Sequence, residues 1–282
     1  MRVLWISLIS VVPLVGYAQI PWSKSIQSGG SGYFYQGSVV KESGWSIEGY
    51  GSGLWKNHRL EVGGMYTRIH FKGGAVLRQQ EYTLSYTTYI KSRVWLRGGM
   101  HGIFSTDEAT HRGWVGFLGI GLYQLHRWYA GIEGYLSQYP QYPGGLSVRQ
   151  IMLSWGRTLF ELYTNHTLTV EVQPVWIALS RSDITGKRNY FAVYNQWSLS
   201  LNRWLFRGIL WAGEQVFAVR NGGFLVLNLP EHHTGAFGGI VSYTFTPAFK
   251  PWIGFFREQF RDIGYVEDVH LLIVSTGLNV YF

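Results

Sequence analysis

The side chains most able to do chemistry are charged or titratable residues on the polar face of segments that alternate between polar and apolar residues. Six are assigned to this face: Arg97, His101, Glu133, Glu171, Arg207 and Arg257. Apolar residues neighbour Arg207 and Arg257 on both faces, so these two follow the pattern less closely. Opposed charges of this kind either pair within a packed interior or line a watery passage and orient a permeating solute. The sequence leaves both alternatives open.

Catalytic and metal-binding patterns are weaker. His101 and Ser105 share a strand face but lie about 13 Å apart, so a catalytic group would need Ser137 or Glu133 from a neighbouring strand. The run Glu231-His232-His233 could suggest a metal site, but adjacent residues of an extended chain point apart. We therefore expect no catalytic residue, no metal and no cofactor.

The chain begins with the pattern of an export signal. A basic residue, Arg2, precedes an apolar run over residues 3–15, and Gly16-Tyr17-Ala18 places small residues before a cut at Gln19. We expect residues 1–18 to be a signal peptide and residues 19–30 a short periplasmic segment. Residues 31–282 would then form the folded body.

The composition narrows the class of protein. Of 282 residues, 46% are hydrophobic, 17% aromatic and only 14% charged, with 36 Gly and no Cys. So many aromatic residues exclude a disordered chain, and the absence of Cys excludes a disulfide-stapled domain. An ordinary soluble enzyme is disfavoured because its surface would carry large apolar patches. No second apolar run is long enough for a membrane helix.

Alternation with a period of two runs through much of the chain. It is clear over residues 81–90, 128–137, 191–201 and 237–245. In the first of these, Tyr82, Leu84 and Tyr86 would face lipid, while Glu81 and Thr83 would face a lumen. This pattern is typical of a membrane barrel wall.

The breaks between these segments predict the number of strands. Short, often basic turns occur near residues 56–58, 91–93, 126–127, 164–166, 202–203 and 247–250. They alternate with generally longer connections at residues 41–44, 72–76, 106–112, 138–145, 181–187, 218–232 and 262–268. We predict an all-β fold, a transmembrane antiparallel up-and-down β-barrel of about 14 strands, with 12 as the alternative.

The C-terminal segment is amphipathic and ends in an aromatic residue. Leu278, Val280 and Phe282 fall on one face of it. This ending resembles the C-terminal signal of bacterial outer-membrane β-barrel proteins, a class rather than a single family. The resemblance implies recognition by the barrel-assembly machinery and location in the bacterial outer membrane.

Aromatic and basic residues fit the same class. Seven Trp residues fall near the proposed strand ends, where their rings favour the headgroup boundary: Trp45, Trp55, Trp114, Trp128, Trp155, Trp204 and Trp252. The net charge of +8 becomes +7 when residues 1–18 are removed, and much of the basic excess lies in or beside turns and loops. We expect contacts with outer-membrane lipid and lipopolysaccharide, and no nucleic-acid partner.

Three functions remain in consideration. The leading hypothesis is a channel or binding barrel for small solutes, lined by the charged residues of the polar face. The second is a non-conducting structural or assembly barrel, whose longest loop, residues 218–232, would dock another protein or plug the mouth. The third is an envelope enzyme that modifies lipid.

Overall fold

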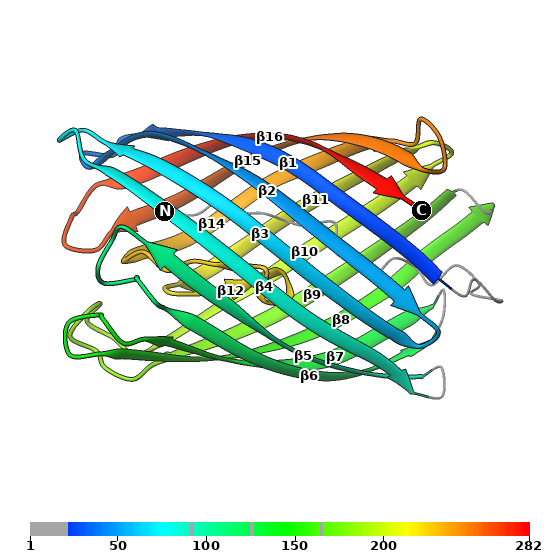
Figure 1. Ribbon diagram of the computed structural model, residues 1–282, viewed down its shortest axis with the longest axis horizontal. Coiled ribbons are helices and arrows are strands. Elements are labelled where there is room, and N and C mark those ends of the chain that lie inside the picture. The colour runs from blue at the N-terminus through cyan, green and yellow to red at the C-terminus, as the bar shows by residue number, and fades with distance from the viewer. Residues whose placement is uncertain (1–21, 91–92, 125–126, 164–165) are drawn as a thin grey trace.

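The fold is a single closed barrel of antiparallel strands, whose direction is inclined to the long axis (Figure 1). The computed structural model describes residues 22–90, 93–124, 127–163 and 166–282. The predicted signal peptide lies outside them. The wall has 14 strands, which confirms the predicted fold class and strand number.

The barrel strands follow one another around the wall, and β1 pairs with β16 to close it. They are β1 (Trp22–Gln36), β2 (Lys41–Trp55), β3 (His58–Phe71), β4 (Val76–Ile90), β5 (Val94–Ser105), β6 (Trp114–Gln124), β7 (Trp128–Tyr139), β8 (Leu146–Tyr163), β9 (His166–Leu179), β10 (Asn189–Leu201), β11 (Trp204–Gln215), β14 (Glu231–Tyr243), β15 (Phe249–Asp262) and β16 (Asp268–Tyr281). Closure leaves no unpaired sheet edge. No α-helix among the described residues is long and apolar enough to cross a membrane.

The first strand begins earlier than expected. Residues 19–30 were predicted to be a periplasmic segment, but β1 starts at Trp22, where it pairs with β2, and it pairs with β16 from Ser25 on. Its Ser- and Gly-rich sequence lacks the apolar alternation that marks the other strands. It is nevertheless a strand because it pairs with neighbours on both sides, and the hydrogen bonds of the ladder come from backbone groups that do not depend on the side chain.

The two ends of the barrel differ in the length of their connections. At one end, here called the short-turn end, β2 and β3 join through Lys56-Asn57, and β10 and β11 through Asn202-Arg203. Lys56 and Asn202 have positive φ values of 55° and 54°, as tight hairpin turns require. The opposite end, the long-loop end, carries the longer connections, including residues 216–230. The predicted alternation of short turns and longer loops is confirmed.

The outer face of the wall is apolar. Tyr82, Leu84 and Tyr86 of β4 are exposed, whereas Glu81 and Thr83 are buried inside, as predicted. The same exposure of large apolar side chains recurs around the barrel, and reaches 74% at Leu118. Soluble proteins do not expose an apolar surface of this extent to water. The belt matches the lipid-facing band of a membrane barrel.

Aromatic residues lie at both ends of this belt. Six of the seven predicted boundary tryptophans are exposed on the outer face: Trp45, Trp55, Trp114, Trp128, Trp155 and Trp204. The prediction for Trp252 is wrong, because its side chain points inward and is buried. There it packs on Gly277, where an added Cβ would lie 2.5 Å from the indole ring.

The last strand has the predicted amphipathic pattern. Leu278 and Val280 alternate with the buried, inward-facing Asn279, and Phe282 is 71% exposed at the short-turn end. This places the apolar face of the ending toward lipid. Its recognition by the assembly machinery stays a prediction.

Candidate functional site

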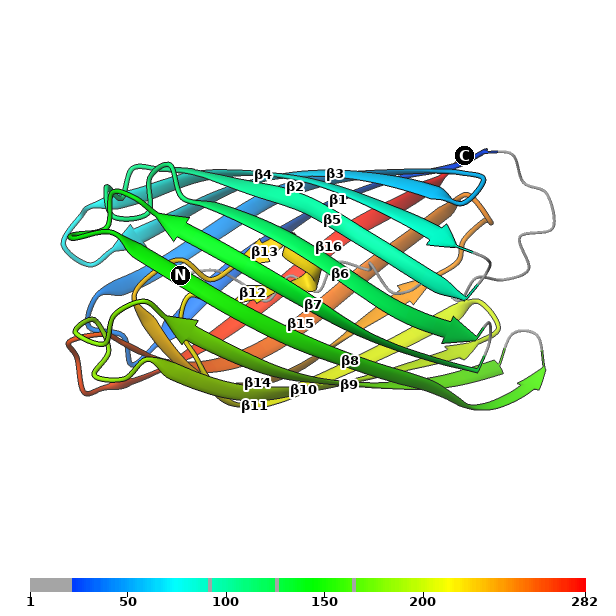
Figure 2. The same ribbon diagram turned by 90° about the horizontal axis from the view of Figure 1, so that it is seen from below.

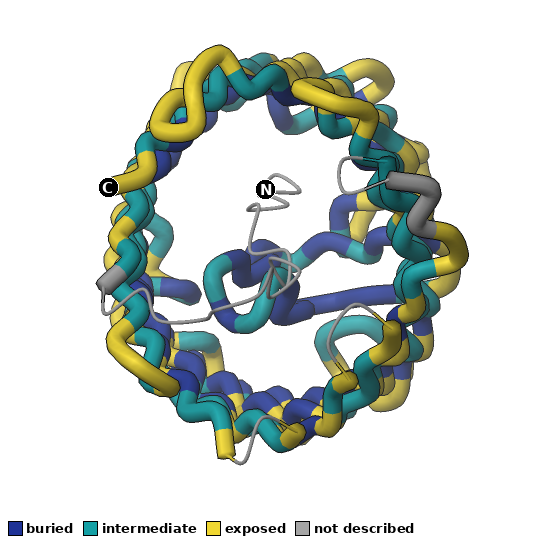
Figure 3. The backbone as a smooth tube through the Cα atoms, turned by 90° about the vertical axis from the view of Figure 1, so that its right-hand side faces the viewer, coloured by how far each residue is buried: buried dark blue, intermediate teal, exposed yellow. Residues whose placement is uncertain are grey.

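Residues 216–230, here called the inward loop, leave the end of β11 and fold into the lumen before β14 begins (Figures 2 and 3). The loop contains a small hairpin formed by β12 (Val219–Arg220) and β13 (Leu225–Val226). A single 3-10 turn, η1 (Asn221–Gly223), joins them with positive φ at all three residues. Most of the inward loop is buried. It therefore lies across the lumen and not over the surface.

Three wall strands hold the inward loop by polar contacts. The side-chain amide of Gln150 on β8 bonds both backbone groups of Val219, at 2.5 Å and 2.8 Å. Arg97 on β5 donates a hydrogen bond of 2.7 Å to the carbonyl oxygen of Gly222. Asn228 donates one of 3.1 Å to Gln79 of β4. Each of these wall residues satisfies a buried polar group that would otherwise be left without a partner.

A buried charge cluster holds the loop on the opposite side. It consists of Arg220 of the loop and five wall residues, namely Lys41, Glu231, His233, Glu258 and Asp262. Arg220 lies 3.2 Å from Glu258, and its guanidinium also stacks 4.6 Å from the centre of the Trp211 ring. Lys41 lies 2.6 Å from Glu231 and also pairs with Asp262. The cluster therefore ties β2, β14, β15 and the inward loop together.

The charges of this cluster balance only with a protonated histidine. Nε2 of His233 lies 3.1 Å from Glu231, and Nδ1 lies 2.9 Å from Glu258. An imidazole can donate from both nitrogens only as the cation. Three cations then face three carboxylates, so the buried cluster carries no net charge.

Apolar packing completes the attachment of the loop. The ring of Phe217 lies 5.3 Å from that of Tyr139 and 5.8 Å from that of Tyr142. Phe224 packs on Tyr50 at 5.2 Å and occupies the space that a side chain at Gly63 would fill. The base and the tip of the inward loop are thus both packed against the wall.

The exposure of inward-facing residues changes along the wall. On β9, Thr169, Glu171 and Gln173 are partly exposed, whereas Val175 and Ile177, nearer the long-loop end, are buried. The same change occurs on β10 between Tyr194, which is partly exposed, and the buried Ala192. On the side of the barrel formed by β5–β10, solvent therefore reaches the lumen wall from the short-turn end. On the remaining side, inward residues at the same end are buried, among them Thr87 of β4, Trp252 of β15 and Asn279 of β16. We call the accessible part of the lumen, beside β5–β10, the vestibule.

An aromatic side chain lies flat on the vestibule wall. Trp95 of β5 covers three inward positions of β6 and β7 that are all glycine, namely Gly119, Gly121 and Gly131. A Cβ at Gly131 would lie 2.5 Å from the indole ring and one at Gly119 would lie 3.0 Å from it, while Gly121 is closer still. Only glycine lets the ring approach the wall so closely. The ring, here called the Trp95 platform, is partly exposed.

Five of the six predicted lumen residues face inward. Arg97 and Glu133 form an ion pair of 3.3 Å beside the Trp95 platform. His101 is buried between Glu81, at 3.0 Å, and Thr83, at 2.7 Å. These contacts favour the interpretation that inward charges pair with one another at this level of the wall.

The other two residues that face inward lie apart from this pair. Glu171 accepts a hydrogen bond of 2.6 Å from Gln173. Arg207 is buried on β11 and contacts Ser198 at 3.4 Å. The structure therefore does not gather the predicted residues into one site.

The assignment of Arg257 to the lumen is wrong. Its side chain is exposed on the outer face of β15, in line with Ile253 and Phe255, and the inward acidic residues of this strand are Glu258 and Asp262. Aromatic residues occupy both faces of β15, so apolar character does not reveal which face is the inner one. The pairing of β15 with its neighbours sets the register instead.

The charge cluster and Gln150 were not predicted as site residues. Lys41 was placed in a connection, and Glu231 and His233 belonged to the run dismissed as a metal site. Among the described residues, no group of potential ligands could hold a metal ion. His101 and Ser105 do not meet either, because Ser105 contacts Asp107 and His111 of the following loop.

Comparison with known proteins identifies the fold. No family model and no curated protein matches the sequence. One similar solved structure is the CymD monoaromatic hydrocarbon channel, with a TM-score of 0.60, 9% identity, and coverage of 92% of this chain and 88% of that one. Another is the Ralstonia pickettii toluene transporter TbuX, with a TM-score of 0.59, 8% identity, and coverage of 96% and 91%.

A third similar structure is a bacterial polysaccharide outer membrane secretin, with a TM-score of 0.55, 9% identity, and coverage of 92% and 98%. At such identities the likeness concerns the fold alone. With its closed wall and apolar belt, the chain has the fold of bacterial outer-membrane β-barrel proteins, the class that the sequence predicted.

Proposed function

We propose that the protein is an outer-membrane channel for small solutes that the inward loop holds closed. The supporting observation is the change in exposure of the lumen wall, from the partly exposed Gln173 to the buried Val175 on β9. One continuous segment of chain, the inward loop, lies within the lumen (Figure 3). A barrel of 14 strands is wider than barrels of about 8 strands, which side chains alone can fill.

The vestibule and the wall beyond it indicate the kind of solute. The Trp95 platform offers a flat apolar surface, and the Arg97–Glu133 pair beside it offers polar partners. Around the inward loop the wall is apolar, with Ile103, Val115 and Ile177 among its residues. We propose a small solute with a flat apolar face. The structural neighbours CymD and TbuX are described as a hydrocarbon channel and a toluene transporter.

Cysteine labelling tests the closed lumen directly, because the chain has no Cys of its own. Thr169→Cys lies in the vestibule, and Ser137→Cys lies on the buried wall of β7. We expect a water-soluble maleimide to label the first at least about tenfold faster than the second, because reaction requires access to solvent. Equal labelling of the two positions would contradict a lumen closed by the loop.

The Trp95 platform makes a prediction about affinity. Trp95→Ala is expected to weaken binding of a small aromatic solute by about threefold to tenfold, because one stacked ring contact contributes about 0.5–1.5 kcal/mol. Binding to the detergent-solubilised barrel can be followed by saturation-transfer NMR, which does not depend on conduction. Trp114→Ala, on the outer face, is the matched control and should leave the affinity unchanged.

A non-conducting plugged barrel is the second candidate function. The firm attachment of the inward loop favours this function. Gln150 and Arg97 bond its backbone from one side of the lumen, and Glu258 pairs with its Arg220 from the other. Planar bilayer recordings separate the two functions. A plugged barrel gives no conductance steps at any voltage, and a channel gives steps whose frequency rises when contacts of the loop are removed.

A further inference from the structure

Two arginines lie side by side on the outer face of the barrel. Arg68 of β3 and Arg78 of β4 are direct cross-strand partners near the long-loop end. Each lies between inward-facing buried residues on its strand, Thr67 and Ile69 for Arg68, and Leu77 and Gln79 for Arg78. Both side chains therefore leave the wall on the lipid side.

The pair lies at the level of the membrane boundary. Trp45 of β2 is the cross-strand partner of Arg68, and its exposed ring packs 5.5 Å from that of Tyr66. Amphipathic aromatic rings of this kind favour the headgroup region. In barrels of this class the longer loops are extracellular, which places the pair at the outer boundary of the membrane. There the arginines are within reach of the anionic groups of lipopolysaccharide.

This arrangement lacks a protein counter-charge. Like charges directly opposite one another across two strands are destabilising. Within the described part of the chain neither arginine forms an ion pair, and Nε of Arg68 is buried without a hydrogen-bond partner. The neighbours on the same face are uncharged or weakly basic: Ser43, Trp45, Tyr66, His70 and Gln80. Glu42, at the β2 bulge, pairs with neither arginine.

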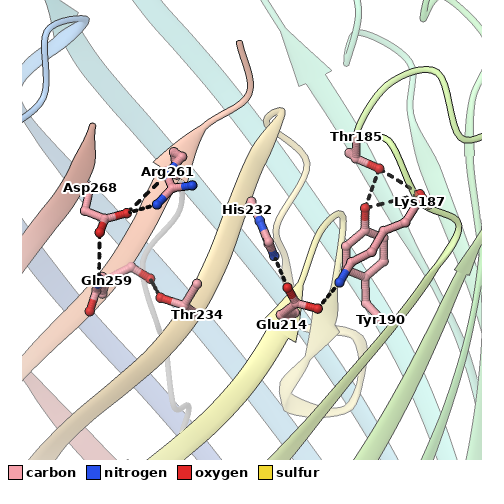
Figure 4. A network of polar contacts seen from close by, with 9 residues as sticks. All are labelled: Thr185, Lys187, Tyr190, Glu214, His232, Thr234, Gln259, Arg261 and Asp268. Atoms are coloured by element: carbon pink, nitrogen blue, oxygen red, sulfur yellow. Dashed lines mark hydrogen bonds and ion pairs between the residues drawn. The ribbon is translucent and has the colours of Figure 1, made fainter. Parts of the chain in front are cut away.

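Three basic residues at the long-loop end near β11, β14 and β15 have acidic partners. Arg261 of β15 bonds Asp268 at 2.7 Å, and Glu214 accepts from Lys187 and lies 3.2 Å from His232 (Figure 4). The wall can thus neutralise basic residues at this end with its own carboxylates. It does not do so at Arg68 and Arg78.

We propose that Arg68 and Arg78 together bind a phosphate group of an outer-leaflet glycolipid. Two guanidinium groups can each donate a pair of hydrogen bonds to phosphate oxygens. A phosphate between them replaces their mutual repulsion with attraction. The rings of Trp45 and Tyr66 then lie against the sugar that carries the phosphate. The expectation of lipopolysaccharide contacts, drawn from net charge, thereby gains a specific site.

Binding by the purified full-length barrel in detergent tests the proposal. Lipopolysaccharide with its phosphates, the same lipopolysaccharide after phosphatase treatment, and inorganic phosphate are compared by native mass spectrometry. Arg68→Gln/Arg78→Gln is expected to weaken binding of the phosphorylated lipid by about tenfold or more, the loss that one or two charge-assisted hydrogen bonds produce. Arg149→Gln/Arg257→Gln is the matched control, because it removes two exposed outward arginines that are not cross-strand partners.

Three results would overturn the proposal. The first is an equal loss in the control variant, which would assign binding to net charge. The second is equal binding of the phosphatase-treated lipid. The third is binding of inorganic phosphate as tight as that of the lipid, which would assign the site to a free anion.

Stability in lipid-free detergent provides a second readout. There Arg68→Gln/Arg78→Gln should leave the melting temperature unchanged or raise it, because it removes an uncompensated repulsion. With phosphorylated lipopolysaccharide present, the natural protein should gain more in melting temperature than the variant. A variant that melts lower than the natural protein without lipid would show that the arginines serve the fold itself, and would contradict the proposal.

Discussion

Replacing residues 217–229 with a short Gly-Ser turn is expected to convert the closed barrel into a conducting one. Gln215 of β11 and His233 of β14 are already cross-strand partners, so a short turn can join the two strands without the inward loop. The replacement removes the one described segment that crosses the lumen. We expect single-channel conductance in planar bilayers to rise about tenfold or more over the natural protein. The reason is that the width of this barrel lies between that of side-chain-filled barrels of about 8 strands and that of open porins of about 16.

A matched control shortens a loop that stays at the surface. Residues 181–187 join β9 and β10 at the same end of the barrel, and most are partly or fully exposed. Their replacement by the same turn should leave conductance unchanged. Retarded migration on unheated gels checks that each variant still forms a barrel. A folded variant without the inward loop that never conducts would refute the proposed channel.

Glu258→Gln is expected to cause the largest loss of stability among single substitutions in the charge cluster. Glu258 is fully buried and faces both Arg220 and His233, at 3.2 Å and 2.9 Å. Removing its charge takes away the carboxylate that faces both Arg220 and His233, so one buried positive charge is left uncompensated. Breaking a buried ion pair from one side costs about 3–5 kcal/mol. We expect a loss of this size in denaturant unfolding, together with tryptic cleavage at Arg220 in the released loop.

The control is an ion pair of the same chemistry in a more exposed place. Glu214 pairs with Lys187 near the outer rim, and both side chains are more than 40% exposed. Glu214→Gln should cost about 0–1 kcal/mol and leave Arg220 protected from trypsin. Combining Glu258→Gln with Arg220→Gln should restore part of the loss, because the second change removes a cation that the first left unpaired. Equal losses for Glu258→Gln and Glu214→Gln would contradict the role given to the cluster.

The two proposals concern different surfaces and fail independently. Conductance and loop release report on the inward loop, whereas lipid binding reports on Arg68 and Arg78 at the outer face. A barrel that never conducts can still bind a phosphorylated glycolipid.

The sequence by itself determined the class, the strand number and most of the two faces. On β4, strict alternation separates Tyr82 and Leu84 from Glu81 and Thr83, and the structure follows it residue by residue. Such predictions succeed because a strand has a period of two and lipid accepts only one of its faces. They fail on β15, where aromatic residues on both faces conceal the inner position of Trp252 and the outer position of Arg257.

Only the tertiary structure decided how the lumen is filled. Arg97 meets Gly222 across 125 residues of chain, Gln150 meets Val219 across 69, and Lys41 meets Asp262 across 221. No local pattern encodes these contacts, because they arise when barrel closure brings distant strands around one loop. The cations and carboxylates of the cluster face one another only in that arrangement, so its members look unrelated until the wall has closed.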